Sequence, residues 1–117
     1  PDAILTAYGT NDWSHGSREE FLKKCGDFFR NLSENYPSSQ IYALTPIWRK
    51  DYLDQKPFGH FFSVKQEVVS ITKSFKNITV LDCFDMVPHD EIYYSDRRLH
   101  PNDEGNQCMS DGLLKLI

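Results

Sequence analysis

Short apolar runs alternate along the chain with longer segments whose apolar residues recur every three or four positions. The runs at 3–8, 40–44 and 77–81 stop at polar or turn-forming residues, which is typical of buried β-strands. The segments at 17–36 and 63–75, which lie between these runs, show helical spacing. A further helical pattern precedes the C-terminus. The chain therefore predicts the element order β-α-β-α-β-α.

Polar residues at the expected helix starts support this order. Ser17 with Glu20, and Ser63 with Gln66, match the capping-box pattern, in which side chains satisfy free backbone N–H groups. Asn102 offers an N-cap for the terminal helix. The residues expected on the buried faces of the first two long helices are Phe21, Leu22, Cys25, Phe28, Phe29, Leu32, Tyr36, Val68, Val69, Ile71 and Phe75.

Strands that alternate with helices predict a parallel sheet with right-handed crossovers. Ligands of such sheets collect beyond the C-terminal ends of the strands. The polar turn 9–12 follows the first strand at such an end, and an aromatic-rich loop, 48–62, follows the second. The loop around His100 opens on the same edge. We therefore expect these loops to converge on Asn11.

The segment from Asp96 to Gly105 carries the most specific chemistry. His100 directly precedes Pro101, and the residue before a proline is driven from helical into extended geometry. His100 is therefore expected on a loop at the mouth of the terminal helix, with the carboxylate of Asp96 just upstream. This arrangement suits a general base and the group that orients it.

In the segments 9–12 and 96–105 the chain resembles the SGNH hydrolases, also called GDSL lipases or esterases. Gly9-Thr10-Asn11-Asp12 is similar to their third conserved block. Asp96 through Gly105 is similar to their fifth block, an Asp-x-x-His signature that often continues Pro-Asn-x-x-Gly. Thr45-Pro46-Ile47 is similar to the segment that follows the family's corresponding strand. The resemblance covers the whole chain, as the later half of an SGNH domain, and implies a flavodoxin-like three-layer α/β/α fold.

The resemblance also implies a serine nucleophile, a histidine base and an oxyanion hole, with no cofactor or metal. Asn11 matches the residue whose side-chain amide donates to the oxyanion, His100 matches the base, and Asp96 would orient His100. A fixed amide N–H aimed at developing charge contributes about a hundred- to a thousandfold in rate. The substrate would be a small ester or an acylated sugar.

Two departures from the family pattern bear on this expectation. Asp96 lies four residues before His100 rather than three, as if one residue were inserted. Either the loop bulges to restore the pairing, or a backbone carbonyl orients His100 while Asp96 pairs with an arginine. In addition, no serine of the chain has the nucleophile's Gly-Asp-Ser-Leu context. The nucleophile is therefore expected outside this chain, and residues 1–117 alone are expected to be inactive.

These departures keep a second hypothesis open, namely a non-catalytic binding or interaction module that retains the fold. A nucleotide-binding domain is disfavoured because no glycine-rich phosphate loop follows the first strand. Asp12, Trp48 and Phe58 are candidates for lining a substrate pocket. For Trp48 and Phe58, packing of the aromatic loop onto the sheet is an equally good interpretation.

Composition narrows the partners. A single domain is expected for 117 residues. The net charge is −4 and the Lys and Arg residues are scattered, so no basic surface for binding nucleic acid is expected. No membrane span is present in the sequence. Three widely spaced cysteines predict buried free thiols and favour a reducing compartment, although a secreted bacterial protein with free thiols is also compatible.

The start of the chain leads to a further expectation. Pro1-Asp2 passes directly into an apolar strand without an initiator Met, so we expect the C-terminal portion of a longer domain. Three parallel strands alone would leave an apolar sheet edge open. Self-association through that edge, or pairing with a missing N-terminal segment, is therefore predicted.

Overall fold

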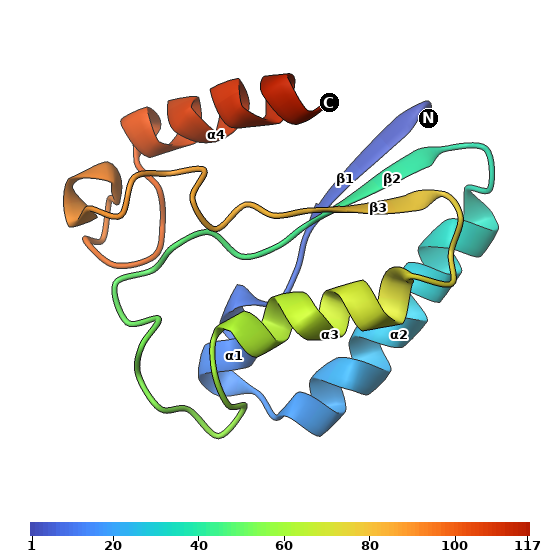
Figure 1. The fold of residues 1–117 in the computed structure, drawn as a ribbon, viewed down its shortest axis with the longest axis horizontal. Helices are drawn as coiled ribbons and strands as arrows, with labels where there is room; N and C mark the ends of the chain where they lie inside the picture. Colours follow the sequence, from blue (N-terminus) through green and yellow to red (C-terminus); the bar gives the residue numbers. More distant parts are fainter.

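Three parallel strands form the central sheet of the computed structural model, which describes all residues 1–117 (Figure 1). The strands are β1 (Ala3–Ala7), β2 (Gln40–Leu44) and β3 (Ile78–Leu81), in the order β1-β2-β3. Ala3 aligns with Gln40, and Ile41 aligns with Ile78. The parallel sheet predicted from the alternation of elements is confirmed.

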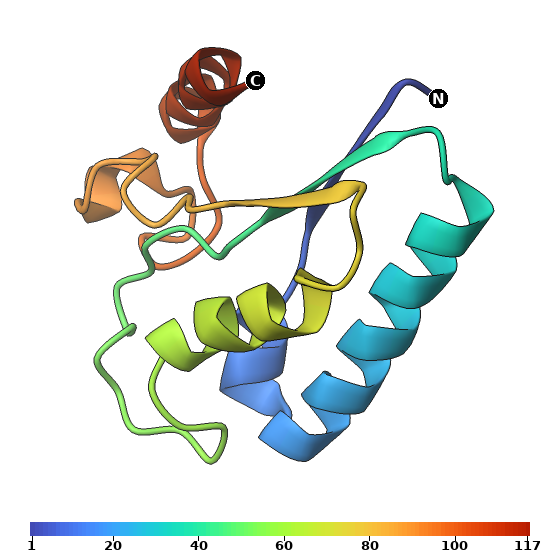
Figure 2. The ribbon, with the colours of Figure 1, turned by 45° about the vertical axis from the view of Figure 1, so that its right-hand side comes forward.

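Helices cover both faces of this sheet. The long helix α2 (Arg18–Asn35), helix α3 (Phe62–Thr72) and the short α1 (Thr10–His15) lie on one face, and α4 (Asp103–Leu116) lies on the other (Figures 1 and 2). A single turn of 3-10 helix (Glu91–Tyr93) interrupts the loop between β3 and α4. The three-layer, flavodoxin-like α/β/α arrangement expected from the sequence is confirmed.

Two of the three expected helix caps form. The Ser17 hydroxyl accepts the N–H of Glu20 at 3.2 Å, and the Asn102 side chain accepts the N–H of Gly105 at 3.0 Å. The capping box predicted at Ser63 is wrong, because α3 begins one residue earlier and has no side-chain cap. Its first turn is closed by backbone bonds instead, with the Ser63 N–H donating to the carbonyl of His60 at 3.0 Å.

The larger part of the core lies between the sheet and α1, α2 and α3. Val69 was expected to face inward but is 42% exposed, whereas Val64, Val68 and Thr72 are buried. These three residues are spaced four apart, along one row of the helix. The other residues expected to face inward do so, since Val68 is buried and Ile71 and Phe75 pack against the core. The buried residues of this cluster are Trp13, Phe21, Cys25, Phe29, Ala43, Phe58, Phe61, Val64 and Val68.

The opposite side of the sheet has a thinner core. Leu44, Leu81 and Cys83 form a small buried cluster there, and Met109 and Leu113 of α4 pack on it. Cys25 and Cys83 are buried, Cys108 is half-buried, and all three are free thiols. None of the helices combines the length and the apolar character that a membrane-spanning helix requires.

Gly9 turns the chain directly from β1 into α1. It has φ 116° and ψ −18°, a left-handed conformation that favours glycine. A Cβ at this position would lie 2.5 Å from Cγ1 of Val64 in α3. The residues expected to form only a polar turn therefore begin a short helix, and Asn11 lies in its first turn.

We predict that Gly9→Ala destabilises the protein by about 2–4 kcal/mol, since the substitution combines backbone strain with overpacking against Val64. Gly26→Ala is the matched control, because a Cβ at Gly26 in α2 meets nothing within 4 Å. It should stabilise the protein by about 0.5–1 kcal/mol through helix propensity. Urea unfolding measures both, and equal stabilities for the two variants would contradict the prediction.

Candidate active site

A cavity of about 300 Å³ lies at the C-terminal ends of β1 and β2. Asn11 from the start of α1 and His100 from the loop before α4 both line it. The wall of the cavity also includes Thr10, Arg49 and Met109. The expectation that the Asn11 turn and the His100 loop face a common space is confirmed, whereas their chemical roles stay predictions.

Asp96 holds the loop that carries His100. Its Oδ1 accepts the backbone N–H groups of Arg98, Leu99 and His100 at 2.9, 2.9 and 3.1 Å. Its Oδ2 lies 2.6 Å from Nδ1 of His100. A single carboxylate thus fixes both the backbone and the imidazole of the loop.

The additional residue between Asp96 and His100 is accommodated by a local bulge. Arg97 adopts φ 58° and is the only non-glycine residue with a positive φ. Of the two alternatives that the spacing left open, the restored pairing of Asp96 with His100 is the one observed. The Arg98 side chain pairs with a different carboxylate, since its Nε lies 3.6 Å from Oδ2 of Asp51.

The contacts around Asp96 shift its ionisation. Burial acts to raise the pKa of this carboxyl, but the N–H groups of Leu99 and His100, the His100 ring and the N–H of Arg98 together hold the pKa well below its usual range. Asp96 is therefore ionised near neutral pH. Because the carboxylate binds Nδ1, Nε2 is the ring nitrogen left for a reacting group.

Asn11 presents its side chain without a structural role in the turn. The residue is exposed, and the N-cap of α1 is Gly9, so no side chain caps this helix. The backbone carbonyl of Asn11 accepts the Ser14 hydroxyl at 3.2 Å. The simpler interpretation of Asn11, a turn residue whose side chain caps the backbone, is therefore not what the structure contains.

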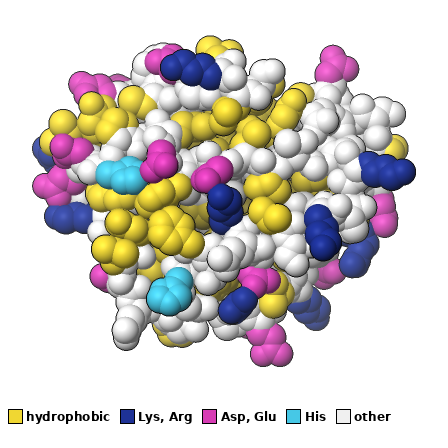
Figure 3. Space-filling view, viewed as in Figure 1, with side chains coloured by type: hydrophobic (Ala, Val, Ile, Leu, Met, Phe, Trp, Pro, Cys, Tyr) yellow, Lys and Arg dark blue, Asp and Glu magenta, His cyan; other side chains and the backbone are white.

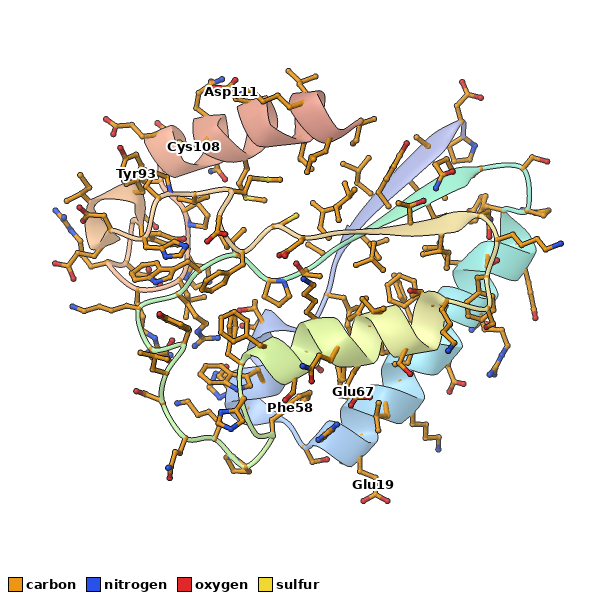
Figure 4. All side chains as sticks on the ribbon, in the orientation of Figure 1. Glu19, Phe58, Glu67, Tyr93, Cys108 and Asp111 are labelled. Atoms are coloured by element: carbon orange, nitrogen blue, oxygen red, sulfur yellow. The ribbon has the colours of Figure 1, made fainter.

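Asp12, Trp48 and Phe58 do not line this cavity. Phe58 is 2% exposed and lies below α3 in the core, with its ring centroid 5.3 Å from that of Phe21 (Figure 4). Trp48 is buried and stacks on the His89 ring at 5.7 Å. For both aromatic residues the packing alternative holds, and the expectation that they face the Asn11–His100 cavity is wrong. The half-buried Asp12 lies in the first turn of α1, outside the cavity wall.

Arg49 is the wall residue that the sequence did not single out. Its side chain is 1% exposed and contacts Asp51 and Thr10. In the sequence, Arg49-Lys50-Asp51 reads as a solvated run of charges inside an aromatic loop. Only the Arg–Asp spacing of two residues could have suggested a local ion pair, and nothing local indicates the contact with Thr10.

A second hollow, of about 250 Å³, lies beyond the ends of β2 and β3 and shares Thr45 and Pro46 with the first. Its wall includes an ion pair of 2.7 Å between Lys65 Nζ and Asp82 Oδ2. The hydrogen bond from Lys65 lowers the pKa of Asp82, and burial opposes it. Phe62, which lines this hollow, is 46% exposed. Apolar side chains gather on the face of the molecule that Figure 3 shows. No cluster of His, Cys, Asp or Glu in the structure could hold a metal ion.

Comparisons with known proteins identify the fold alone. No family model and no curated protein matches the chain. One solved crystal structure superimposes with a TM-score of 0.80 at 16% identity, over 97% of this chain and 63% of its own. A structural-genomics crystal structure of a Lactobacillus plantarum protein gives a TM-score of 0.77 at 17% identity, over 98% and 65%. The chain thus spans less than two thirds of the length of either structure.

The depressed pKa of Asp96 predicts a pH-dependent contribution to stability. Because the folded-state pKa lies below the unfolded value of about 3.9, the stabilisation is complete above that value and is lost as the pH falls toward the folded pKa. Asp96→Asn should therefore be less stable than wild type at neutral pH. Urea unfolding should show this difference shrinking as the pH falls below about 4.

The matched control is Asp27→Asn, whose carboxylate is 56% exposed and lies 3.5 Å from Arg30 on α2. This variant should stay within about 0.5 kcal/mol of wild type throughout the pH range. A stability difference for Asp96→Asn that is constant from neutral to acid pH would contradict the role assigned to its charge.

Proposed function

We propose that residues 1–117 belong to the catalytic domain of a serine acyl-ester hydrolase of the SGNH type, acting on a small ester or an acylated sugar. The observation that carries the proposal is one cavity lined by both Asn11 and His100, with Asp96 bound to the far nitrogen of the imidazole. The likeness to solved structures supports the α/β fold on which this chemistry would be built.

In the proposed reaction, His100 Nε2 takes the proton of a serine hydroxyl as the serine oxygen attacks the ester carbonyl. The Asn11 side-chain N–H donates to the oxyanion that develops on the carbonyl oxygen. Protonated His100 then gives its proton to the departing alkoxide. In the second half of the reaction, His100 takes a proton from water as the water oxygen attacks the acyl-serine. His100 then returns this proton to the departing serine oxygen, and the acyl group leaves as a carboxylic acid. Asp96 keeps the imidazole oriented and stabilises its charged form.

The nucleophile of this reaction is proposed to come from a segment outside these residues. No serine or cysteine lines the cavity. The two threonine hydroxyls in its wall are engaged, since Thr10 accepts from Arg49 at 3.3 Å and Thr45 accepts the N–H of Cys83 at 2.9 Å. Burial raises the pKa of the Cys83 thiol to about 11, so this thiol stays protonated near neutral pH.

An open surface beside the cavity is where we propose that such a segment binds. Strand β1 pairs only with β2, so its other edge is unpaired. An apolar groove runs between β1 and α4, lined by Leu5, Met109 and Leu113 among others. Leu5 is 48% and Leu114 78% exposed. Either an N-terminal segment of a longer protein or a second copy of the chain would cover this surface.

We expect the full-length protein that contains residues 1–117 to cleave short-chain nitrophenyl esters or acetylated sugars. His100→Ala should lower kcat by about a hundredfold to ten-thousandfold through loss of the base. Asn11→Ala should lower kcat by about a hundred- to a thousandfold. His60→Ala is the control, because His60 is exposed and borders a different hollow. Equal rates for wild type and His100→Ala would remove His100 from the mechanism.

The absence of a serine or cysteine from the cavity wall also favours a second candidate function, a non-catalytic module that binds a ligand in this cavity. The two functions differ in one measurement. A full-length protein that binds an ester or acylated sugar without releasing acid would support the module.

The exposed edge leads to a prediction about association. Residues 1–117 prepared alone should self-associate with increasing concentration, since β1 and the apolar groove beside α4 stay uncovered. Leu114→Glu should reduce this association, and Leu53→Glu is the control because Leu53 is equally exposed, at 78%, but lies outside the groove. Light scattering after gel filtration measures the mass. A well-folded monomer with no partner would contradict the proposed role of this surface.

A further inference from the structure

Arg49 is a charged side chain placed almost wholly out of solvent, and all its nitrogens have partners. Its Nε and Nη2 donate to the two oxygens of Asp51 at 2.5 and 3.0 Å. Its Nη1 donates to the carbonyl and hydroxyl oxygens of Thr10 at 2.9 and 3.3 Å. The guanidinium also stands 4.9 Å from the centre of the Trp13 ring in α1. Such complete pairing is what the burial of a charge requires.

The same short segment also contacts the other loop of the cavity. The backbone N–H of Lys50 donates to the carbonyl of Arg98 at 2.9 Å. The guanidinium of Arg98 lies 3.6 Å from the Asp51 carboxylate, on the oxygen that also accepts from Arg49. Asp51 is therefore shared between an arginine bound to the Asn11 turn and an arginine of the His100 loop.

Thr10 directly precedes Asn11, and Arg98 lies two residues before His100. We propose that Arg49, Lys50 and Asp51 form a positioning bracket that sets the separation between the Asn11 amide and the His100 imidazole. The two loops are far apart in the sequence, and this one segment bonds directly to both. The catalytic consequence of the bracket rests on the proposed function, whereas its geometric consequence does not.

The pattern of donors distinguishes positioning from substrate binding. Although Arg49 lines the cavity, each of its nitrogens already donates to Asp51 or Thr10. A substrate anion would have to displace the half-buried Asp51 or the Thr10 carbonyl to reach a well-oriented pair of donors. Substitution of Arg49 should therefore change how well the reacting groups are aligned rather than how tightly substrate is held.

Backbone amide exchange in the full-length protein tests the geometric claim. Arg49→Lys keeps the charge but cannot bond both sides, so amide exchange should quicken at Trp13 and also at Leu99 and His100. Arg98→Gln removes only the contact between Arg98 and Asp51, so it should quicken amide exchange at Leu99 and His100 alone. Arg18→Gln, which loses an exposed pair with Glu67 on the surface, should change neither region.

The outcomes of this experiment separate the bracket from a general loss of stability. Exchange that rises uniformly, including in β2 and α2, or that changes in only one loop for Arg49→Lys, overturns the proposal. If Arg49→Lys fails to fold, Asp51→Asn takes its place. This substitution weakens the contacts of residue 51 with both Arg49 and Arg98 and leaves the size of the side chain unchanged. Asp51→Asn should give the same two-loop pattern.

Ester cleavage tests the catalytic consequence. A misplacement of about 1 Å costs on the order of a hundredfold in rate, so Arg49→Lys should lower kcat about ten- to a hundredfold while KM changes little. A raised KM with unchanged kcat would show that Arg49 holds substrate and would overturn the positioning role. If wild type cleaves no ester, the proposed function fails, and the exchange pattern still decides the bracket.

Discussion

The Asp96 carboxylate is the contact on which the candidate site depends. One oxygen accepts three consecutive backbone N–H groups, and the other binds the His100 ring at 2.6 Å. These bonds stabilise a loop that contains a non-glycine residue, Arg97, in left-handed geometry, which costs on the order of 1–3 kcal/mol. Without the carboxylate, the loop would lose the bonds that offset this strain, and the imidazole would lose its orientation.

The sheet provides the frame on which this loop acts. Parallel strands end at one edge, so the turn after β1 and the loop after β2 both open toward the His100 loop. Gly9 allows α1 to begin immediately after β1 and to pack closely on Val64 of α3. Between the two loops, the buried Arg49 pairs with Asp51, and the half-exposed Arg98 lies 3.6 Å from the same carboxylate. The site is therefore held by polar contacts between loops, above a core that is held by apolar ones.

Local sequence patterns were sufficient for most of the fold. The three strands, the Ser17 cap of α2 and the Asn102 cap of α4 each follow from a few neighbouring residues, and each is present. The outward position of Val69 on α3 and the short helix α1 were not predicted. Their geometry depends on what packs against them, as Val69 turned outward and Gly9 against Val64 illustrate.

The candidate site was predictable only in part, for the same reason. The pairing of Asp96 with His100 is local and follows from their spacing once Arg97 takes up the additional residue. The role of Arg49 depends on Thr10 and Arg98, which are remote in the sequence, so no local pattern reveals it. Trp48 and Phe58 were left as candidates for either the pocket or the core, because large aromatic residues suit both and the sequence does not distinguish the two.

The most direct test of the account is a crystal structure of the full-length protein after reaction with a fluorophosphonate, which reacts covalently with activated serines and imitates the oxyanion. The account predicts a phosphonyl-serine adduct whose oxygen lies within hydrogen-bond distance of the Asn11 amide, with His100 Nε2 beside the serine oxygen. An adduct remote from these two residues, or a protein that stays unmodified, would contradict it.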